Sequence, residues 1–144
     1  IELNSPSLFR AYRGSDTHPS ADGWYETGDN GSFTNNVLQV FGRSDDMIIT
    51  GGENVWPIAV ERVVSTIPGV ERVVVRGIDD AQWGQRVVAW IVSSNPVAPS
   101  LEEVRQHVKQ QLPSFCAPTE IRIVNDIPTT SLGKVDFPTL KNLW

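Results

Sequence analysis

The chain has 144 residues, one Cys and a formal net charge of -5, because 17 acidic residues exceed 12 Lys and Arg. This length suits one domain, or a small domain with an appendage. A single Cys excludes an internal disulfide and a zinc site built from Cys. No apolar run is long enough to cross a bilayer. The excess of acidic residues argues against a general nucleic-acid binder.

The chain begins with Ile1 rather than Met, and no basic segment followed by an apolar one comes after it. We therefore interpret it as part of a longer or processed protein without a secretory signal, and we expect a cytoplasmic location.

Residues 1–42 are rich in Gly, Ser and Asn, and they predict irregular β-structure rather than helix. Short strand signals occur at 1–3, 24–25 and 37–41. Asn35 and Asn36 predict a hairpin turn, because Asn tolerates positive φ. The segment has too few apolar positions to form a core of its own.

From residue 43 onward the pattern predicts a compact α+β domain of about 100 residues. Pro57 is suited to the first turn of a helix, and Ser100 with Glu103 predicts a capping box at the start of another. The predicted elements, in chain order, are a strand at 46–50, a helix at 58–66, strands at 70–78 and 86–94, a helix at 100–112, a strand at 121–124 and a short C-terminal helix.

The first cluster that could carry chemistry is Thr27-Gly28-Asp29. A turn of this kind places a carboxylate at a sharp bend, where it can accept hydrogen bonds from a diol such as a ribose. An ordinary turn with a solvated Asp is the alternative, and this motif alone favours it.

The second cluster runs from Arg43 through the strand at 46–50 to Gly51-Gly52 and Glu53. Arg43 offers a planar fork for a phosphate or carboxylate, and the two glycines permit close approach of the backbone to a ligand. A glycine turn with a surface Arg is the alternative. The spacing lacks the third glycine of a dinucleotide-binding fingerprint.

The third cluster is a loop at 128–136 that carries Lys134 after Gly133. It is not a phosphate-binding P-loop, because position 128 is Pro and Val135 follows the Lys. A mobile Lys suits a phosphate or a carboxylate, and a solvated loop Lys is the alternative. Cys116 reads as a small buried hydrophobe rather than a nucleophile.

Taken together and in order, these segments resemble the C-terminal part of the adenylate-forming enzymes, which include acyl- and aryl-CoA ligases, luciferases and peptide-synthetase adenylation domains. The matching segments are GWYETGD (23–29), GRSDDMIITGGENVWPIAVE (42–61) and IPTTSLGKVD (127–136). Such ligases convert a carboxylate and ATP to an acyl-adenylate, and then transfer the acyl group to CoA.

The resemblance implies roles for individual residues. Thr27 and Asp29 would bind the nucleotide, with Asp29 on the ribose hydroxyls, and Arg43 would contact the ribose and phosphate region. Asp45 would be the hinge about which a small domain rotates between the two half-reactions. Lys134 would be the catalytic residue, stabilising charge on the substrate carboxylate and α-phosphate during adenylation.

The resemblance also implies a CoA side, on which Gly51, Gly52, Glu53 and Trp83 would face the pantetheine tunnel. Two departures place contacts in doubt. Many members have a basic residue after the aromatic at position 115, where this chain has Cys116, and many have one after the Lys-Val pair, where this chain has Asp136-Phe137.

The implied organisation is a β-rich remnant of a large N-terminal AMP-binding domain at 1–42 and a mobile C-terminal lid domain at 43–144, with a short β-sheet flanked by helices. The implied ligands are ATP, CoA, a small carboxylic acid and Mg²⁺, with the metal held mainly by upstream residues, so no metal site is expected on this chain. Its partner would be its own N-terminal domain, a homodimer is left open, and this chain alone should be inactive.

Within the family, the resemblance is greatest to the o-succinylbenzoate–CoA ligases of menaquinone biosynthesis, on the segment TGGENVWP (50–57) and the short interval 62–126. The alternatives are a medium-chain or aryl acyl-CoA ligase, a peptide-synthetase adenylation subdomain, a luciferase-like oxygenase, or a non-catalytic binding module.

Overall fold

The computed structural model describes residues 1–14 and 19–143, and the chain divides into two compact units, Ile1–Asp45 and Asp46–Trp144. The division lies three residues beyond the boundary expected at 42/43. Within the described residues, no helix has the length and apolar character needed to cross a membrane.

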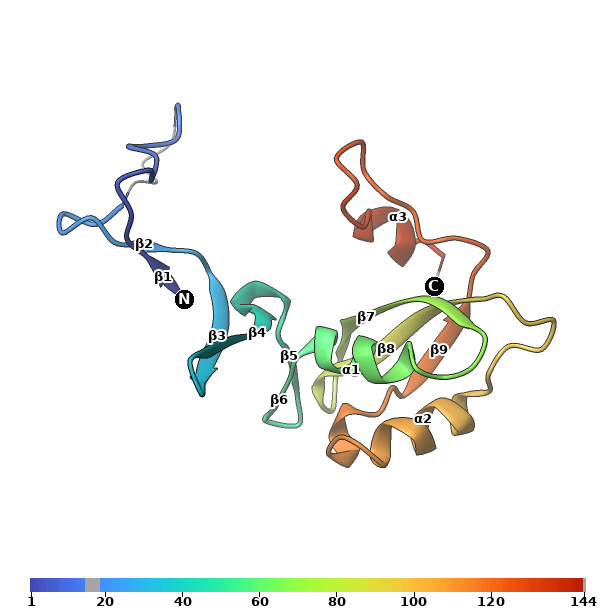
Figure 1. The fold of residues 1–144 in the computed structure, drawn as a ribbon. Helices are drawn as coiled ribbons and strands as arrows, with labels where there is room; N and C mark the ends of the chain where they lie inside the picture. Colours follow the sequence, from blue (N-terminus) through green and yellow to red (C-terminus); the bar gives the residue numbers. More distant parts are fainter. Residues whose placement is uncertain (15–18, 144) are drawn as a thin grey trace. The chain divides into compact units, whose positions relative to one another are not determined.

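The N-terminal unit consists of two small antiparallel sheets (Figure 1). Strand β1 (Glu2–Leu3) pairs with β2 (Tyr25–Glu26), and β3 (Asp29–Thr34) pairs with β4 (Val37–Arg43). Asn35 and Asn36 form the turn of the second hairpin with φ of 51° and 62°, which confirms the turn expected from the sequence. None of the described residues in this unit is buried, in agreement with the expected lack of a core.

The C-terminal unit is built on a five-stranded sheet. Its strands are β5 (Ile48–Thr50), β6 (Glu53–Val55), β7 (Val70–Asp80), β8 (Gly84–Ser93) and β9 (Glu120–Ile123). β8 pairs with β7 along its length, with β9 in parallel and with β5 at Thr50 and Gly84. All neighbours except β9 are antiparallel.

Helices cover both faces of this sheet (Figure 1). α1 (Pro57–Val64) and α2 (Leu101–Lys109) pack with one face through a cluster that includes Val60, Val75 and Val104. The five-residue α3 (Phe137–Lys141) packs on the other face, where Leu140 joins Trp90 and Ile127. Because both faces are covered, β8 is buried without interruption from Val87 to Val92 and does not alternate.

The α+β class and the small sheet flanked by helices are confirmed. The strand expected at 46–50 is present as the shorter β5, because Asp46 belongs to a 3₁₀ turn, η1 (Ser44–Asp46). The sequence did not predict β6. Gly51 and Gly52 have φ of 58° and 84°, so they reverse the chain into a hairpin before the helix begins rather than leading directly into it.

The predicted start signals of both long helices are present. Pro57 occupies the first turn of α1. The Ser100 hydroxyl accepts a hydrogen bond from the Glu103 amide, and the Glu103 carboxylate accepts one from the Ser100 amide, which together form the capping box. α2 ends at Lys109, three residues before the expected end at 112.

Candidate functional site

In the N-terminal unit, the Thr27-Gly28-Asp29 corner is held by short polar contacts. The Thr27 hydroxyl donates to the Ile1 carbonyl at 2.8 Å and accepts from the Asp29 amide at 3.1 Å. Gly28 has a φ of 76°, which favours glycine, and its carbonyl accepts from the Ser44 amide at 2.9 Å. The corner therefore fixes the backbone of Asp29 at the start of β3 while leaving its carboxylate accessible.

Arg43 lies opposite this corner, because Asp29 and Arg43 are a register pair of the β3–β4 hairpin. Its guanidinium Nη1 is 3.8 Å from Asp29 Oδ1 and donates to the Thr27 carbonyl at 3.3 Å. Nη2 is 3.5 Å from Asp45 Oδ2. A Cβ at Gly28 would lie 3.0 Å from Arg43 Nη2, so a larger residue there would crowd the guanidinium. The structure thus brings four predicted residues together: Thr27, Asp29, Arg43 and Asp45.

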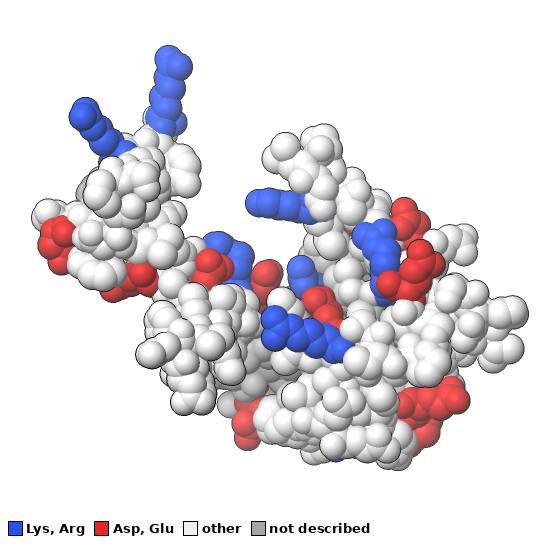
Figure 2. Space-filling view, viewed as in Figure 1, with Lys and Arg blue, Asp and Glu red and all other residues white. Residues whose placement is uncertain are grey.

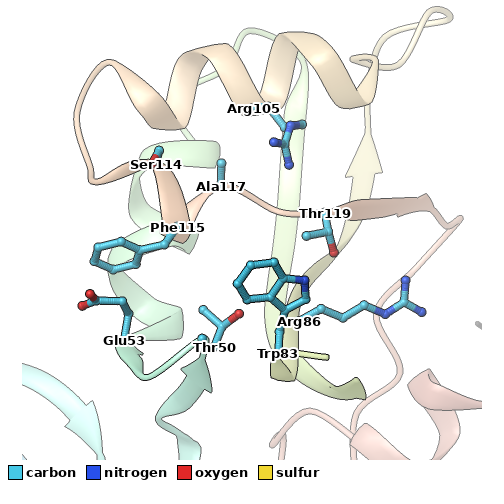
Figure 3. A pocket seen from close by; sticks show the side chains of 10 residues that line it. Thr50, Glu53, Trp83, Arg86, Arg105, Ser114, Phe115, Ala117 and Thr119 are labelled. Atoms are coloured by element: carbon cyan, nitrogen blue, oxygen red, sulfur yellow. The ribbon is translucent and has the colours of Figure 1, made fainter. Parts of the chain in front are cut away.

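In the C-terminal unit, a pocket of about 250 Å³ opens beside the β5–β6 hairpin. We call it the Trp83 pocket; its lining residues are Thr50, Gly51, Glu53, Trp83, Arg86, Arg105, Ser114, Phe115, Ala117 and Thr119. Figure 3 shows the Trp83 indole in the middle, with Arg105 pointing toward it from α2 and Phe115 beside Glu53. Two aromatic rings and two guanidinium groups therefore line one opening.

The Gly51 backbone lies directly against Trp83. Its amide donates to the Trp83 carbonyl at 2.9 Å, and a Cβ at this position would be 2.9 Å from Cε3 of the indole. Gly51 is therefore needed both for its positive φ and for this close approach. Of the four residues expected on the CoA side, Gly51, Glu53 and Trp83 line the pocket, whereas Gly52 does not.

Asp80 holds the β7–β8 turn that carries Trp83. Its Oδ1 accepts hydrogen bonds from the amides of Gln82 and Trp83, both at 2.9 Å. These two N–H groups hold the pKa of the Asp80 carboxyl below its ordinary value, because they favour the ionised form. The indole is half exposed at 53% and is thus presented on an anchored turn.

Two arginines of the pocket differ in their partners. The Arg86 guanidinium pairs with Glu120, at 2.7 Å between Nη1 and Oε2. Arg105 donates to the Pro118 carbonyl at 2.7 Å, and it forms no ion pair with a carboxylate of the described residues. The positive charge of Arg105 is therefore available to an anion in the pocket.

Lys134 lies in a tight hairpin formed by residues 128–136, the Lys134 hairpin. The amide of Thr130 donates to the Lys134 carbonyl at 2.7 Å, that of Gly133 to the Thr130 carbonyl at 2.9 Å, and that of Asp136 to the Pro128 carbonyl at 2.9 Å. The Lys134 side chain is exposed and forms no ion pair with a described residue. Its ammonium is therefore free to meet a ligand.

Lys134 and the Trp83 pocket lie on different faces of the C-terminal unit. The Lys134 hairpin leads into α3, whereas the pocket takes Arg105 from α2 and Phe115 from η2 (Ser114–Cys116). α2 and α3 cover opposite faces of the sheet (Figure 1). The structure does not bring these two predicted sites together.

The positions that depart from the family pattern have distinct structural environments. Cys116 is buried in the core of α1 and α2, as expected for a small hydrophobe, and burial raises the pKa of its thiol. The Asp136 carboxylate caps α3 by accepting from the Thr139 amide at 3.1 Å. Phe137 packs edge-on against Trp90, with ring centroids 5.8 Å apart.

Sequence reasoning missed two of the charged residues of the pocket, Arg86 and Arg105. Arg105 directly follows Val104, and its place beside the apolar stripe of the predicted helix was the available signal. Arg86 was read only as part of a strand. Arg86 is only three residues from Trp83 in the sequence, but Arg105 could not be placed near Trp83, because it reaches the pocket from a separate helix.

The described residues contain no cluster of three or more His, Cys, Asp or Glu side chains that could hold a metal ion. On the face shown in Figure 2, basic and acidic side chains of the C-terminal unit are interspersed rather than separated into fields of one sign.

Comparison with known families matches residues 59–134, more than half of the chain, to the "AMP-binding enzyme C-terminal domain". Among curated proteins, the chain is 39% identical over 146 residues to the "Probable 2-succinylbenzoate--CoA ligase" of Mycobacterium tuberculosis, covering 97% of this chain and 38% of that protein. It is 31% identical over 141 residues to the mitochondrial malonate–CoA ligase of Xenopus laevis, covering 94% of this chain and 24% of that protein.

Solved structures are also similar to this chain. o-Succinylbenzoate CoA synthetase (MenE) from Bacillus subtilis, in complex with its acyl-adenylate intermediate, matches with a TM-score of 0.87 and 30% identity over 97% of this chain and 29% of that one. ATP-bound MatB from Rhodopseudomonas palustris matches with a TM-score of 0.86 and 29% identity over 98% and 29%. The chain spans between a quarter and two fifths of the length of these proteins.

Proposed function

The chain belongs to the AMP-binding enzymes through their C-terminal domain, and from this premise we propose that it is the C-terminal portion of an ATP-dependent carboxylate–CoA ligase. We further propose that residues 1–42 are the end of its large N-terminal domain and residues 43–144 its mobile lid. We call the protein that joins this chain to that domain the full-length enzyme.

One observation carries the proposal: a single small domain presents an exposed Lys on one face and an aromatic, basic pocket on the other. Two half-reactions with different substrates need different protein groups at one reaction centre. A domain that turns one face and then the other toward that centre supplies both sets of groups.

In the first half-reaction, a carboxylate oxygen attacks the α-phosphorus of ATP, and pyrophosphate leaves with the electrons of the broken P–O bond. Negative charge develops between the carboxylate and the α-phosphate, where the ammonium of Lys134 stabilises it. Asp29 accepts hydrogen bonds from the ribose hydroxyls, and Arg43, held beside it at 3.8 Å, binds the ribose and phosphate region.

In the second half-reaction, the thiol of CoA attacks the acyl carbonyl of the adenylate and AMP leaves. The Trp83 pocket has the composition that the nucleotide end of CoA requires: an indole for stacking and the guanidinium of Arg105 for a phosphate. Gly51 and Glu53, at the edge of the same pocket, would border the path of the pantetheine arm.

For the carboxylate substrate we propose o-succinylbenzoate, which would place the enzyme in menaquinone biosynthesis. Relatives from Mycobacterium tuberculosis and Bacillus licheniformis carry the name 2-succinylbenzoate–CoA ligase, at 39% and 33% identity. A second candidate class is a short-chain acyl-CoA ligase, which the malonate–CoA ligase at 31% identity supports. The residues that contact the acyl group are expected in the large domain.

The test is a substrate panel on the full-length enzyme. We expect o-succinylbenzoate to give the fastest ATP–pyrophosphate exchange, and CoA-dependent product formation to follow. Faster turnover of malonate or of a benzoate would replace the substrate assignment while keeping the ligase class. Absence of exchange with every acid would overturn the proposed function.

The CoA assignment has its own test in the Trp83→Leu variant of the full-length enzyme. Loss of one stacking partner should raise the KM for CoA by roughly tenfold while pyrophosphate exchange stays unchanged. An unchanged KM for CoA would remove the pocket from the second half-reaction.

A further inference from the structure

The base of the Lys134 hairpin is anchored in the core on the face of α3. Ile127, just before the hairpin, is 1% exposed, and Val135 and Phe137 pack against the same cluster. The Phe137 ring meets the buried Trp90 edge-on, at an interplanar angle of 88°. The position of Phe137 therefore helps to set where the hairpin leaves the domain.

A second contact holds the Phe137 ring. The guanidinium carbon of Arg76, from β7, lies over this ring at 5.8 Å from its centroid. The Arg76 side chain is only 24% exposed, so the cation is partly desolvated and the attraction is stronger than on an open surface.

Arg76 is itself held in orientation by Glu61 of α1. Glu61 Oε1 accepts from the Val75 amide at 2.8 Å and is 3.6 Å from Arg76 Nη1. The same Nη1 donates to the Val75 carbonyl at 2.8 Å. The guanidinium is thus fixed by two groups, the Glu61 carboxylate and the Val75 carbonyl, before it reaches Phe137.

Below the hairpin, Arg72 of β7 holds the backbone by donating to the Asp126 carboxylate at 2.7 Å and to the Ile127 carbonyl at 3.4 Å. An opening of about 510 Å³ lies between α1 and β7 and reaches Val135, with Glu61 and Arg76 on its wall. Because no packed side chains fill this space, the Arg76 contact limits how far Phe137 and Val135 can shift toward it.

We propose that Arg76, oriented by Glu61, is a positioning residue for Lys134: it clamps Phe137 at the base of the hairpin and so holds the catalytic ammonium in its adenylation geometry. The proposal rests on the proposed function. It also accounts for Phe137 where similar enzymes often have a basic residue, since here Arg76 of β7 supplies a guanidinium on the same face of the sheet.

The experiment compares Arg76→Met with Arg62→Met in the full-length enzyme. Met keeps much of the side-chain length but removes the charge, and Arg62 lines the same opening as an exposed residue of α1. Adenylation is followed by pyrophosphate exchange, and thioester formation by CoA acylation from supplied acyl-adenylate. Hydrogen exchange of the segment 128–136 is measured in the same proteins.

We expect Arg76→Met to lower kcat for adenylation on the order of tenfold, the factor that a partly desolvated cation–π contact can supply. Thioester formation should be unchanged, amides of the Lys134 hairpin should exchange faster, and Arg76→Lys should restore most of the rate. Arg62→Met should behave like the wild type in all of these measurements.

Equal loss in both half-reactions, or no loss in adenylation, would overturn the proposal. If Arg76→Met fails to fold, Phe137→Leu removes the ring but keeps an apolar anchor, and the same selective loss is expected. If the wild-type enzyme catalyses no ATP–pyrophosphate exchange, the proposed function fails. Unchanged hydrogen exchange of the Lys134 hairpin in Arg76→Met would separately refute the role of Arg76 in holding Phe137.

Discussion

Asp29 and Arg43 face each other across the first register pair of the β3–β4 hairpin, with 3.8 Å between Asp29 Oδ1 and Arg43 Nη1. Their side chains are 38% and 52% exposed. An ion pair this open to solvent contributes only about 0–1 kcal/mol to stability. The pair therefore contributes little to holding the hairpin together, and the nucleotide-binding role that we propose for both groups can be tested separately from stability.

Asp29→Ala in the full-length enzyme should raise the KM for ATP in adenylation by roughly tenfold, because the carboxylate that would bind the ribose diol is lost. Its free energy of unfolding should change by less than about 1 kcal/mol. Pyrophosphate exchange and urea unfolding measure the two effects, with Glu26→Ala as the control. An unchanged KM for ATP would contradict the proposed role of Asp29 in binding the ribose.

Lys134→Ala should reduce the rate of adenylation by about 100-fold or more, since the transition state loses a positioned charge. Thioester formation from supplied acyl-adenylate should stay close to the wild-type rate. Lys141→Ala, which removes another exposed ammonium of the same unit, should leave both half-reactions intact. A similar loss in both half-reactions for Lys134→Ala would contradict the two-face assignment.

Asp80→Ala should loosen the turn that presents Trp83, because two backbone N–H groups lose their shared acceptor. We expect the KM for CoA to rise by roughly threefold to tenfold with pyrophosphate exchange unaffected. Asp80→Asn keeps an oxygen acceptor and should be milder, and Asp79→Ala is the neighbouring control. Steady-state kinetics with varied CoA would decide; an effect of equal size in Asp79→Ala would count against the turn as the cause.

Glu61 makes the stability of the C-terminal unit depend on pH. Its burial raises the pKa of the carboxyl above the ordinary 4.5, although the Val75 amide and Arg76 oppose this shift. The folded state then binds more protons than the unfolded state, so this group's contribution is greatest below about pH 4.5 and declines as the pH rises through the folded pKa.

Glu61→Gln should remove this decline, because the amide does not titrate and still offers an oxygen to the Val75 amide. The difference in free energy of unfolding, variant minus wild type, should therefore become more positive as the pH rises. Urea unfolding of the chain between about pH 4 and pH 8 measures it. A difference that does not vary with pH would show that Glu61 does not titrate abnormally.

Asp45 ends the N-terminal unit, and its carboxylate is 83% exposed. If the chain rotates about this residue, as we propose, fixing its φ with Pro should hold one orientation. Asp45→Pro should then retain one half-reaction and lose most of the overall turnover, whereas Asp45→Ala removes the same carboxylate and should turn over normally. Full turnover of Asp45→Pro would eliminate the hinge role.

Much of this protein could be predicted from local sequence. Pro57 and the Ser100–Glu103 capping box mark helix starts, and Asn35-Asn36 marks a hairpin, because each acts on neighbouring backbone groups only. The hydrophobic pattern likewise determined the α+β class. The sequence offers a glycine turn at 51–52, but only the pairing of β5 with β6 shows that this turn reverses the chain into a hairpin.

The motifs themselves determined which residues are candidates: Asp29, Arg43, Asp45 and Lys134 are recognisable by type and order alone. Only the tertiary structure decided their surroundings. It placed Arg105 beside Trp83, separated that pocket from Lys134 by the thickness of a sheet, and set Arg76 over Phe137. Each of these contacts joins residues far apart in sequence, so it depends on how strands pair and on which face each helix covers, and these are properties of the whole domain.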